Sequence, residues 1–201
     1  MAVFYQGLPC LRHPTLTPLM PISMTLPRDL VLDNPLWHTA LTLWRDPQIA
    51  DACLQLQQSG WSVSRILTAI WLATMNQSWD GSEPEGLADW RHCHTTRLRE
   101  LRQELDKEGP CRELREQVKA AELAAEKVEL AWICHTHSLD CNNMSGFSGY
   151  NDDLLSCNLR AAAPSNSTPA ESKAGMTLLK QSLAKNGLHL SPEPVNGVTP
   201  S

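Results

Sequence analysis

A chain of 201 residues has room for one domain of ordinary size with flanking segments. Its formal net charge of −5 argues against a dominant nucleic-acid-binding surface, which usually requires a basic domain. Seven cysteines form an odd set without the spacing of a disulfide framework, and the chain shows neither a signal peptide nor an apolar run of membrane-spanning length. We therefore expect a soluble, cytoplasmic protein with reduced thiols.

Residues 1–33 are predicted to form a disordered N-terminal arm. Five prolines interrupt any helix in this stretch, and no apolar period is sustained through it. Met20 and Met24 lie close to the first predicted helix, so translation could start at Met1, Met20 or Met24. The residues themselves do not decide among these three starts.

Three short helices are predicted between Asn34 and Asn76, because each one follows a residue that can cap a helix N-terminus. The caps are Asn34, Asp46 and Ser62, and proline follows the first two, where a missing N–H costs nothing. The third helix is apolar over the widest arc, which predicts a central position. The helices span 35–45, 47–59 and 63–76, and they contain or adjoin Trp37, Trp44, Trp61 and Trp71.

Two longer helices follow, over 87–108 and 110–138, separated only by Gly109-Pro110. A break this short predicts an antiparallel hairpin. The expected fold is all-α, with the three short helices packed on the hairpin in a domain over 34–139 and with Trp37, Trp71 and Trp90 largely buried. Residues 140–201 are rich in Ser, Asn, Gly and Pro and are predicted to be a mostly disordered tail, with a possible short helix over 176–186 that places Leu179 and Leu183 on one side.

A fixed order of short motifs runs through residues 34–138. They are Asn34-Pro35-Leu36-Trp37, Cys53-Leu54-Gln55-Leu56-Gln57, Trp71-Leu72-Ala73, Trp90-Arg91, Leu98-Arg99, Leu101-Arg102 and Glu122-Leu123-Ala124-Ala125-Glu126. This order resembles a proteobacterial family of small cytoplasmic helical proteins of unknown function. Where that family usually has a valine–asparagine pair at the start of the third helix, this chain has Val63-Ser64. The resemblance implies a helical fold in the cytoplasm and brings no established activity.

Histidine and cysteine cluster at His92–His94 and at Cys134–His137, and both residue types are common zinc ligands. In a hairpin that turns at Gly109, the two clusters lie roughly 12–15 Å apart along the helix axis. The spacing of the histidines within each cluster also separates their rings on a helix. We therefore assign no metal site and no cofactor.

The same antiparallel pairing brings Glu122 and Glu126 near His94 and Arg97. This polar cluster has two interpretations: a carboxylate–histidine pair for acid–base chemistry, or a polar contact that holds the register of two helices. The chain lacks a Ser/His/Asp order, a glycine-rich phosphate loop and a nucleophile elbow. The structural interpretation is favoured, and no catalytic residue is assigned.

Basic residues between Arg91 and Lys119 raise the possibility of an RNA-binding surface on the hairpin. Six acidic residues are interleaved with the eight basic ones, which leaves a small net charge and allows pairing along the helices. A solvated helical face is the favoured interpretation, so a nucleic-acid partner is not expected.

The C-terminal part of the last long helix is a candidate partner-binding surface. Leu130 and Ile133 lie on a second apolar side, and the short helices can cover only part of a helix this long. Arg99 and Arg102 on the neighbouring helix are candidate polar contributors. Two alternatives stay open: these apolar residues are ordinary core, or the helix over 176–186 covers them.

The favoured function is a non-enzymatic helical module that binds a protein partner. The alternatives are a small-molecule enzyme that uses His94 and Glu126, and an RNA-binding hairpin. The partner, the oligomeric state and the biochemical activity do not follow from the residues alone.

Overall fold

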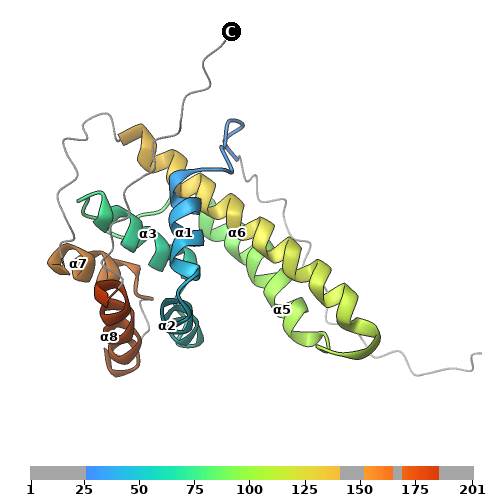
Figure 1. The fold of residues 1–201 in the computed structure, drawn as a ribbon. Helices are drawn as coiled ribbons and strands as arrows, with labels where there is room; N and C mark the ends of the chain where they lie inside the picture. The colour runs from blue at the N-terminus through green and yellow to red at the C-terminus, as the bar shows by residue number, and fades with distance from the viewer. Residues whose placement is uncertain (1–25, 141–151, 165–168, 186–201) are drawn as a thin grey trace, which may run out of the picture.

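Residues 26–140, 152–164 and 169–185 are described by the computed structural model, and all regular secondary structure within them is helical (Figure 1). Three short helices, α1 (Pro35–Trp44), α2 (Pro47–Gln58) and α3 (Val63–Thr74), pack on one another and on a long helical hairpin. The predicted fold class is confirmed, because the chain forms the all-α arrangement of a three-helix unit on an antiparallel hairpin.

The N-termini of α1 and α2 are capped by the residues that the sequence predicts. The side chain of Asn34 accepts a hydrogen bond from the backbone N–H of Trp37 at 2.9 Å, and Asp46 accepts one from Gln48 at 2.7 Å. Each capping residue is followed by proline at the first helical position. Ser62 differs from the prediction: it precedes α3, but its hydroxyl bonds the hydroxyl of Ser64 and makes no side-chain cap.

The hairpin starts with α4 (Leu87–Trp90), continues through a π-helix η1 (Arg91–Thr96) and ends its first arm with α5 (Arg97–Glu104). A 3-10 turn η2 (Gly109–Cys111) leads into α6 (Arg112–Asp140), so the predicted break at Gly109 is confirmed. The first arm is shorter than the predicted 87–108, and its middle turn is wound differently. The turn end of the hairpin lies far from the remaining helices (Figure 1).

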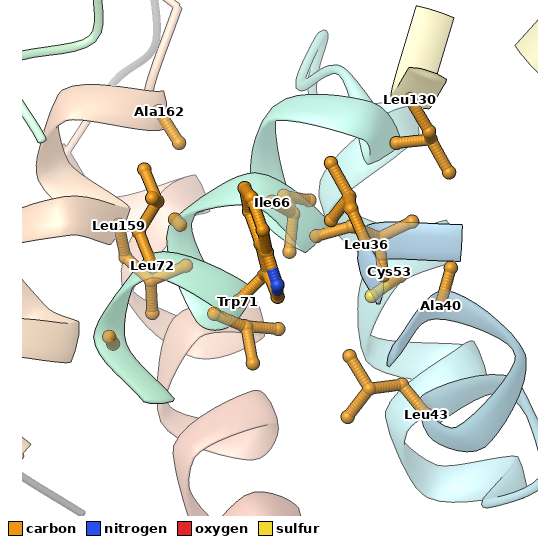
Figure 2. Packing of buried hydrophobic residues seen from close by; sticks show 14 of the residues in the cluster. Leu36, Ala40, Leu43, Cys53, Ile66, Trp71, Leu72, Leu130, Leu159 and Ala162 are labelled. Carbon is orange, nitrogen blue, oxygen red and sulfur yellow. The ribbon is translucent and has the colours of Figure 1, made fainter. Parts of the chain in front are cut away.

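The core lies where α1, α2 and α3 meet the C-terminal part of α6. Figure 2 shows Trp71 between leucines of α3 and α7 on one side and the residues of α1 and α2 on the other. Trp71 is 4% exposed, which agrees with its predicted central position. Trp37 and Trp90 are less buried than Trp71 and pack against the edge of this core.

Two helices occupy a region that composition predicts to be a disordered tail. Helix α7 (Asp152–Ala162) packs on α3, and α8 (Pro169–Lys185) packs on α2. Their buried leucines, Leu155, Leu159, Leu179 and Leu183, extend the core. The expected tail is therefore wrong for these two ranges, and the short helix expected over 176–186 is longer than predicted. The expected arm lies outside the described residues up to position 25.

Polar side chains anchor α7 to the rest of the molecule. The buried amide of Asn158 donates to the carbonyls of Gln77 and Ala69 and accepts from the backbone N–H of Trp79. Arg65 of α3 donates to the carbonyls of Ala161 and Ala162, which end α7. These bonds satisfy backbone groups that burial would otherwise leave unpaired.

Candidate functional site

A groove of about 340 Å³ lies between the three short helices and the hairpin. Helices α1 and α2 form one wall, and the first arm of the hairpin and α6 form the other. Its apolar lining residues are Trp37, Ala40, Leu41, Trp44, Leu54, Val63, Leu67, Leu123 and Leu130. Its polar lining residues are Gln57, Ser62, Ser64, Arg91, Thr95, Arg99, Arg102, Glu122, Glu126 and Glu129.

Large apolar side chains around this groove are open to solvent. Leu41, Trp44, Leu54 and Leu123 are between 41% and 52% exposed, and they come from both walls. The ring of Trp37 is partly covered by Lys127, whose Nζ lies 4.8 Å from the ring centroid. Exposed apolar side chains that share one hollow are typical of a binding site, whereas single ones scattered over a surface are not.

The hairpin wall of the groove carries a cluster of two arginines and two glutamates. Arg99 donates from Nε to Glu122 at 2.9 Å and from Nη2 to Glu126 at 2.6 Å. Arg102 donates to both oxygens of the Glu122 carboxylate. Burial alone would raise the pKa of Glu122, but hydrogen bonds from Arg102 and Arg99 outweigh it and hold this pKa below its ordinary value.

Glu126 has a different environment, although it lies one turn from Glu122. Burial raises the pKa of Glu126 above its ordinary value, and the charge of Arg99 compensates only in part. The negative charges of Glu122 and Glu129 add to the rise. Among the described residues, Arg99 is the one side chain that donates a hydrogen bond to this carboxylate.

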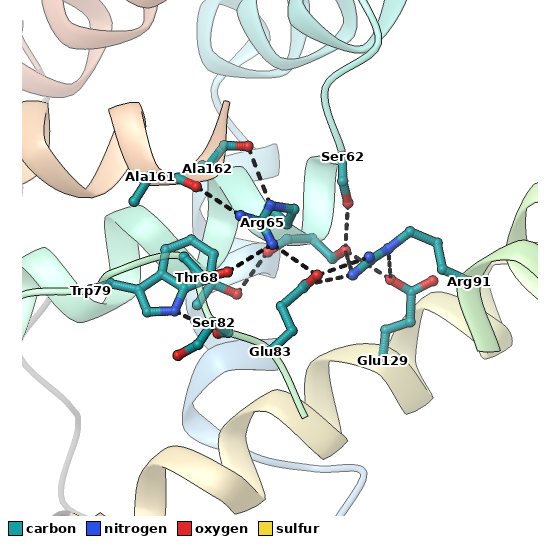
Figure 3. Close-up of polar contacts among 12 residues, drawn as sticks. Ser62, Arg65, Thr68, Trp79, Ser82, Glu83, Arg91, Glu129, Ala161 and Ala162 are labelled. Atoms are coloured by element: carbon teal, nitrogen blue, oxygen red, sulfur yellow. Dashed lines mark hydrogen bonds and ion pairs between the residues drawn. The ribbon is translucent and has the colours of Figure 1, made fainter. Parts of the chain in front are cut away.

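Glu129, which lines the groove, belongs to a buried hydrogen-bond network that continues through Arg91 and Glu83 to Arg65 (Figure 3). The side chain of Glu129 is 2% exposed, and its carboxylate accepts from Ser64 Oγ at 2.8 Å, from Arg91 Nε at 3.0 Å and from the Thr95 hydroxyl. Arg91 also donates to Glu83, which pairs with Arg65 on its other side. Burial would raise the pKa of Glu83, but these two guanidinium groups hold it below its ordinary value.

The π-helix η1 positions the hairpin side of this network. Arg91 and Thr95 are four residues apart in η1, and both reach the carboxylate of Glu129. A π turn is wider than an α turn and is frequent at functional sites. Spacings of four residues in this stretch fit an α-helix equally well, so sequence analysis does not predict it.

The structure brings together only some residues of the predicted polar cluster. Glu122 and Glu126 lie together, but their partners are Arg99 and Arg102, which were predicted for the partner-binding surface. His94 packs against Trp90 with ring centroids 4.3 Å apart and ring planes inclined by 54°, and it does not line the groove. Arg97 is exposed and outside the groove.

The residues predicted for the partner-binding surface also do not form one exposed surface. Ile133 is 1% exposed and belongs to the core, and Leu130 is buried where it borders the groove. The prediction that these two residues are accessible is therefore wrong. The structure instead shows the alternative, in which both belong to the core. They are buried because α1 and α3 pack on α6, whereas the expected cover, α8, packs on α2.

The two histidine–cysteine clusters do not meet. Within the ranges that the structure describes, no three histidine, cysteine, aspartate or glutamate side chains are placed to share a metal ion. Cys134 is buried, and His137 packs edge-on against Trp71 with centroids 6.2 Å apart. None of the described helices combines the length and apolar character needed to cross a membrane.

Residues 35–133 match the model of a family described as Protein of unknown function (DUF2390). The match runs from the first residue of α1 into the buried part of α6 and contains every residue that lines the groove. No curated protein and no solved structure matches the chain. The match supports the resemblance to a family of unknown function and assigns no activity, so function has to be argued from the groove.

Proposed function

We propose that this protein is a non-enzymatic helical module of the cytoplasm that binds a protein partner through the groove. One observation carries the proposal: Leu41, Trp44, Leu54 and Leu123 remain about half exposed around a single hollow. Covering these side chains releases water from apolar surface, which is the main source of affinity in most protein associations.

The catalytic alternative has less support from the same groove. His94, which would serve as its base, packs on Trp90 away from the groove lining. Each arginine of the lining is paired with a glutamate, so these groups are committed to one another. Networks of this kind hold helices together without doing chemistry.

An RNA-binding hairpin is also less supported. Arg91, Arg99 and Arg102 donate to carboxylates, and Arg115 donates to the backbone carbonyls that end α5. Basic groups that neutralise phosphates have to be free to face the nucleic acid. Much of the basic run instead contributes to the structure of the hairpin.

Two matched substitutions on α6 test the proposal. Leu123 is 52% exposed and lines the groove, whereas Leu114 is 50% exposed on the same helix and lies outside it. The full-length tagged protein is purified from its native host with bound proteins, which are identified by mass spectrometry. We expect Leu123→Gln to lose the reproducible partner and Leu114→Gln to retain it.

Thermal unfolding of both variants is the control, and it should match the wild type because both side chains are exposed. A wild-type preparation with no reproducible partner contradicts the proposal. Equal loss of the partner in both variants contradicts the assignment of binding to the groove.

A further inference from the structure

The backbone of the groove walls restricts the form of any bound peptide. Regular structure on both walls is helical within the described residues, so no strand edge is available to pair with an extended peptide. Peptide groups placed against Trp44 and Leu123 would lose water without gaining a hydrogen-bond partner, which is costly. A helix satisfies its own backbone groups and presents only side chains to the groove.

The charges of the groove restrict the side chains of that helix. Arg91, Arg99 and Arg102 each already donate to a carboxylate. Among the three carboxylates that line the groove, Glu129 accepts from three side chains and Glu122 from two arginines, whereas Glu126 accepts from Arg99 alone in the described part of the chain.

Solvent exposure separates the same carboxylates. The side chain of Glu126 is 32% exposed, compared with 8% for Glu122 and 2% for Glu129. Glu126 is therefore the carboxylate that an approaching group can reach. Covering the groove with an apolar segment would remove its remaining water, which disfavours the charged carboxylate unless a second cation pairs with it. Without such a cation the carboxylate would have to take up a proton.

We propose that the partner inserts an amphipathic helix whose apolar side chains cover Leu41, Trp44, Leu54 and Leu123 and whose lysine or arginine pairs with Glu126. This inference rests on the proposed function and adds the chemistry of the bound segment. The pair leaves Arg99 in contact with Glu122, so the existing cluster does not have to open.

The test uses helical peptides displayed on phage as the probe, with randomised positions on one face of the helix. Peptides are selected on the full-length wild-type protein, and affinities of the best peptide are measured by fluorescence anisotropy. We expect selected peptides to combine apolar residues at helical spacing with one basic residue. Leu123→Gln should abolish their binding.

Glu126→Gln is compared with Glu116→Gln, which removes the same charge from an exposed position of α6 outside the groove. We expect Glu126→Gln to weaken binding about tenfold, as loss of one charged hydrogen bond does, and Glu116→Gln to have little effect. A peptide whose basic residue is replaced by glutamine should bind wild type and Glu126→Gln equally well, which assigns the loss to that pair.

The outcomes separate this inference from the proposed function. Two results would overturn the inference and leave the groove as the binding site, provided that the selected peptides fail to bind the Leu123→Gln variant. In the first, the peptides show no preference for a basic residue. In the second, they bind Glu126→Gln as well as wild type. A selection that yields no peptide sensitive to Leu123→Gln overturns both.

Discussion

Glu122 and Glu126 differ by one turn of α6 and share Arg99, yet their pKa values move in opposite directions. Two arginines donate to Glu122, and their favourable interaction exceeds the penalty of burial. Glu126 receives one such bond next to two other negative charges, so burial dominates. The folded state therefore favours the charged form of Glu122 and the neutral form of Glu126.

This difference predicts that the same glutamate-to-glutamine change has different effects on stability at the two positions at neutral pH. Glu122→Gln leaves Arg99 and Arg102 without their shared carboxylate and should lower the free energy of unfolding by about 1–3 kcal/mol. Glu126→Gln removes a charge that burial already disfavours and should leave stability unchanged or slightly higher. Urea denaturation measures both, and equal losses in the two variants would contradict the assignment.

The two substitutions should also respond differently to pH. The pKa of Glu122 is lowered in the folded state, so its contribution is present above its unfolded value near 4.5 and is lost as pH falls through the folded pKa. The cost of Glu122→Gln should shrink in that acidic range. The pKa of Glu126 is raised, so its contribution is present below the unfolded value and is lost as pH rises through the folded pKa.

Residue pairing across the hairpin could be predicted only in part. A turn at Gly109 correctly brings Glu122 and Glu126 opposite the first arm. The expected partners, His94 and Arg97, are replaced by Arg99 and Arg102. The first arm ends at Glu104, and residues 105–108 are not helical, so they span more length per residue than a helix and change which residues face each other across the hairpin. The apolar spacing over 87–108 continues to the turn and does not indicate this early end.

At the scale of elements, the starts of α1 and α2 and the end of α2 follow from local chemistry. Asn34 and Asp46 cap, prolines follow them, and Gly60 has a φ of 86° that ends α2. Helix α7 could not be found in this way, because its segment is rich in polar residues and its buried face includes Asn158. An amide in a core is stable only when distant backbone groups bind it, and these are not visible in the sequence.

The buried hydrogen bonds of Asn158 predict that its substitution lowers the stability of the protein. Asn158→Ala leaves the carbonyl of Gln77 and the N–H of Trp79 without this buried partner, so unfolding should become about 2–3 kcal/mol easier. Cys157→Ala changes an exposed neighbour on the same helix and should cost little. Chemical denaturation of both variants tests the role of α7, and similar stabilities would contradict it.

For the whole molecule, the arrangement of the three-helix unit on the hairpin was predictable, and the groove was not. Apolar periods and helix breaks identify which elements exist and which neighbours pair. The groove depends on how far α1 and α2 stand from α5 and α6, which is set by many side-chain contacts together. Leu41 and Leu123 therefore read as ordinary apolar positions in the sequence, although both are exposed in the groove.

Helices α7 and α8 make the folded unit larger than the segment that matches the family. A chain ending at Asp140 loses the buried side chains of Leu155, Leu159, Leu179 and Leu183 and uncovers α2 and α3. At about 1.5–3 kcal/mol for each buried leucine, the loss is similar to the entire stability of a typical domain.

We therefore expect the chain ending at Asp140 to lack a cooperative thermal transition. A chain ending at Lys185 keeps every described helix and should melt like the full-length protein. Differential scanning calorimetry of the two truncated chains compares them directly. A cooperative transition of the shorter chain at the full-length melting temperature would show that α1 to α6 form an independent domain and that α7 and α8 contribute no stability to it.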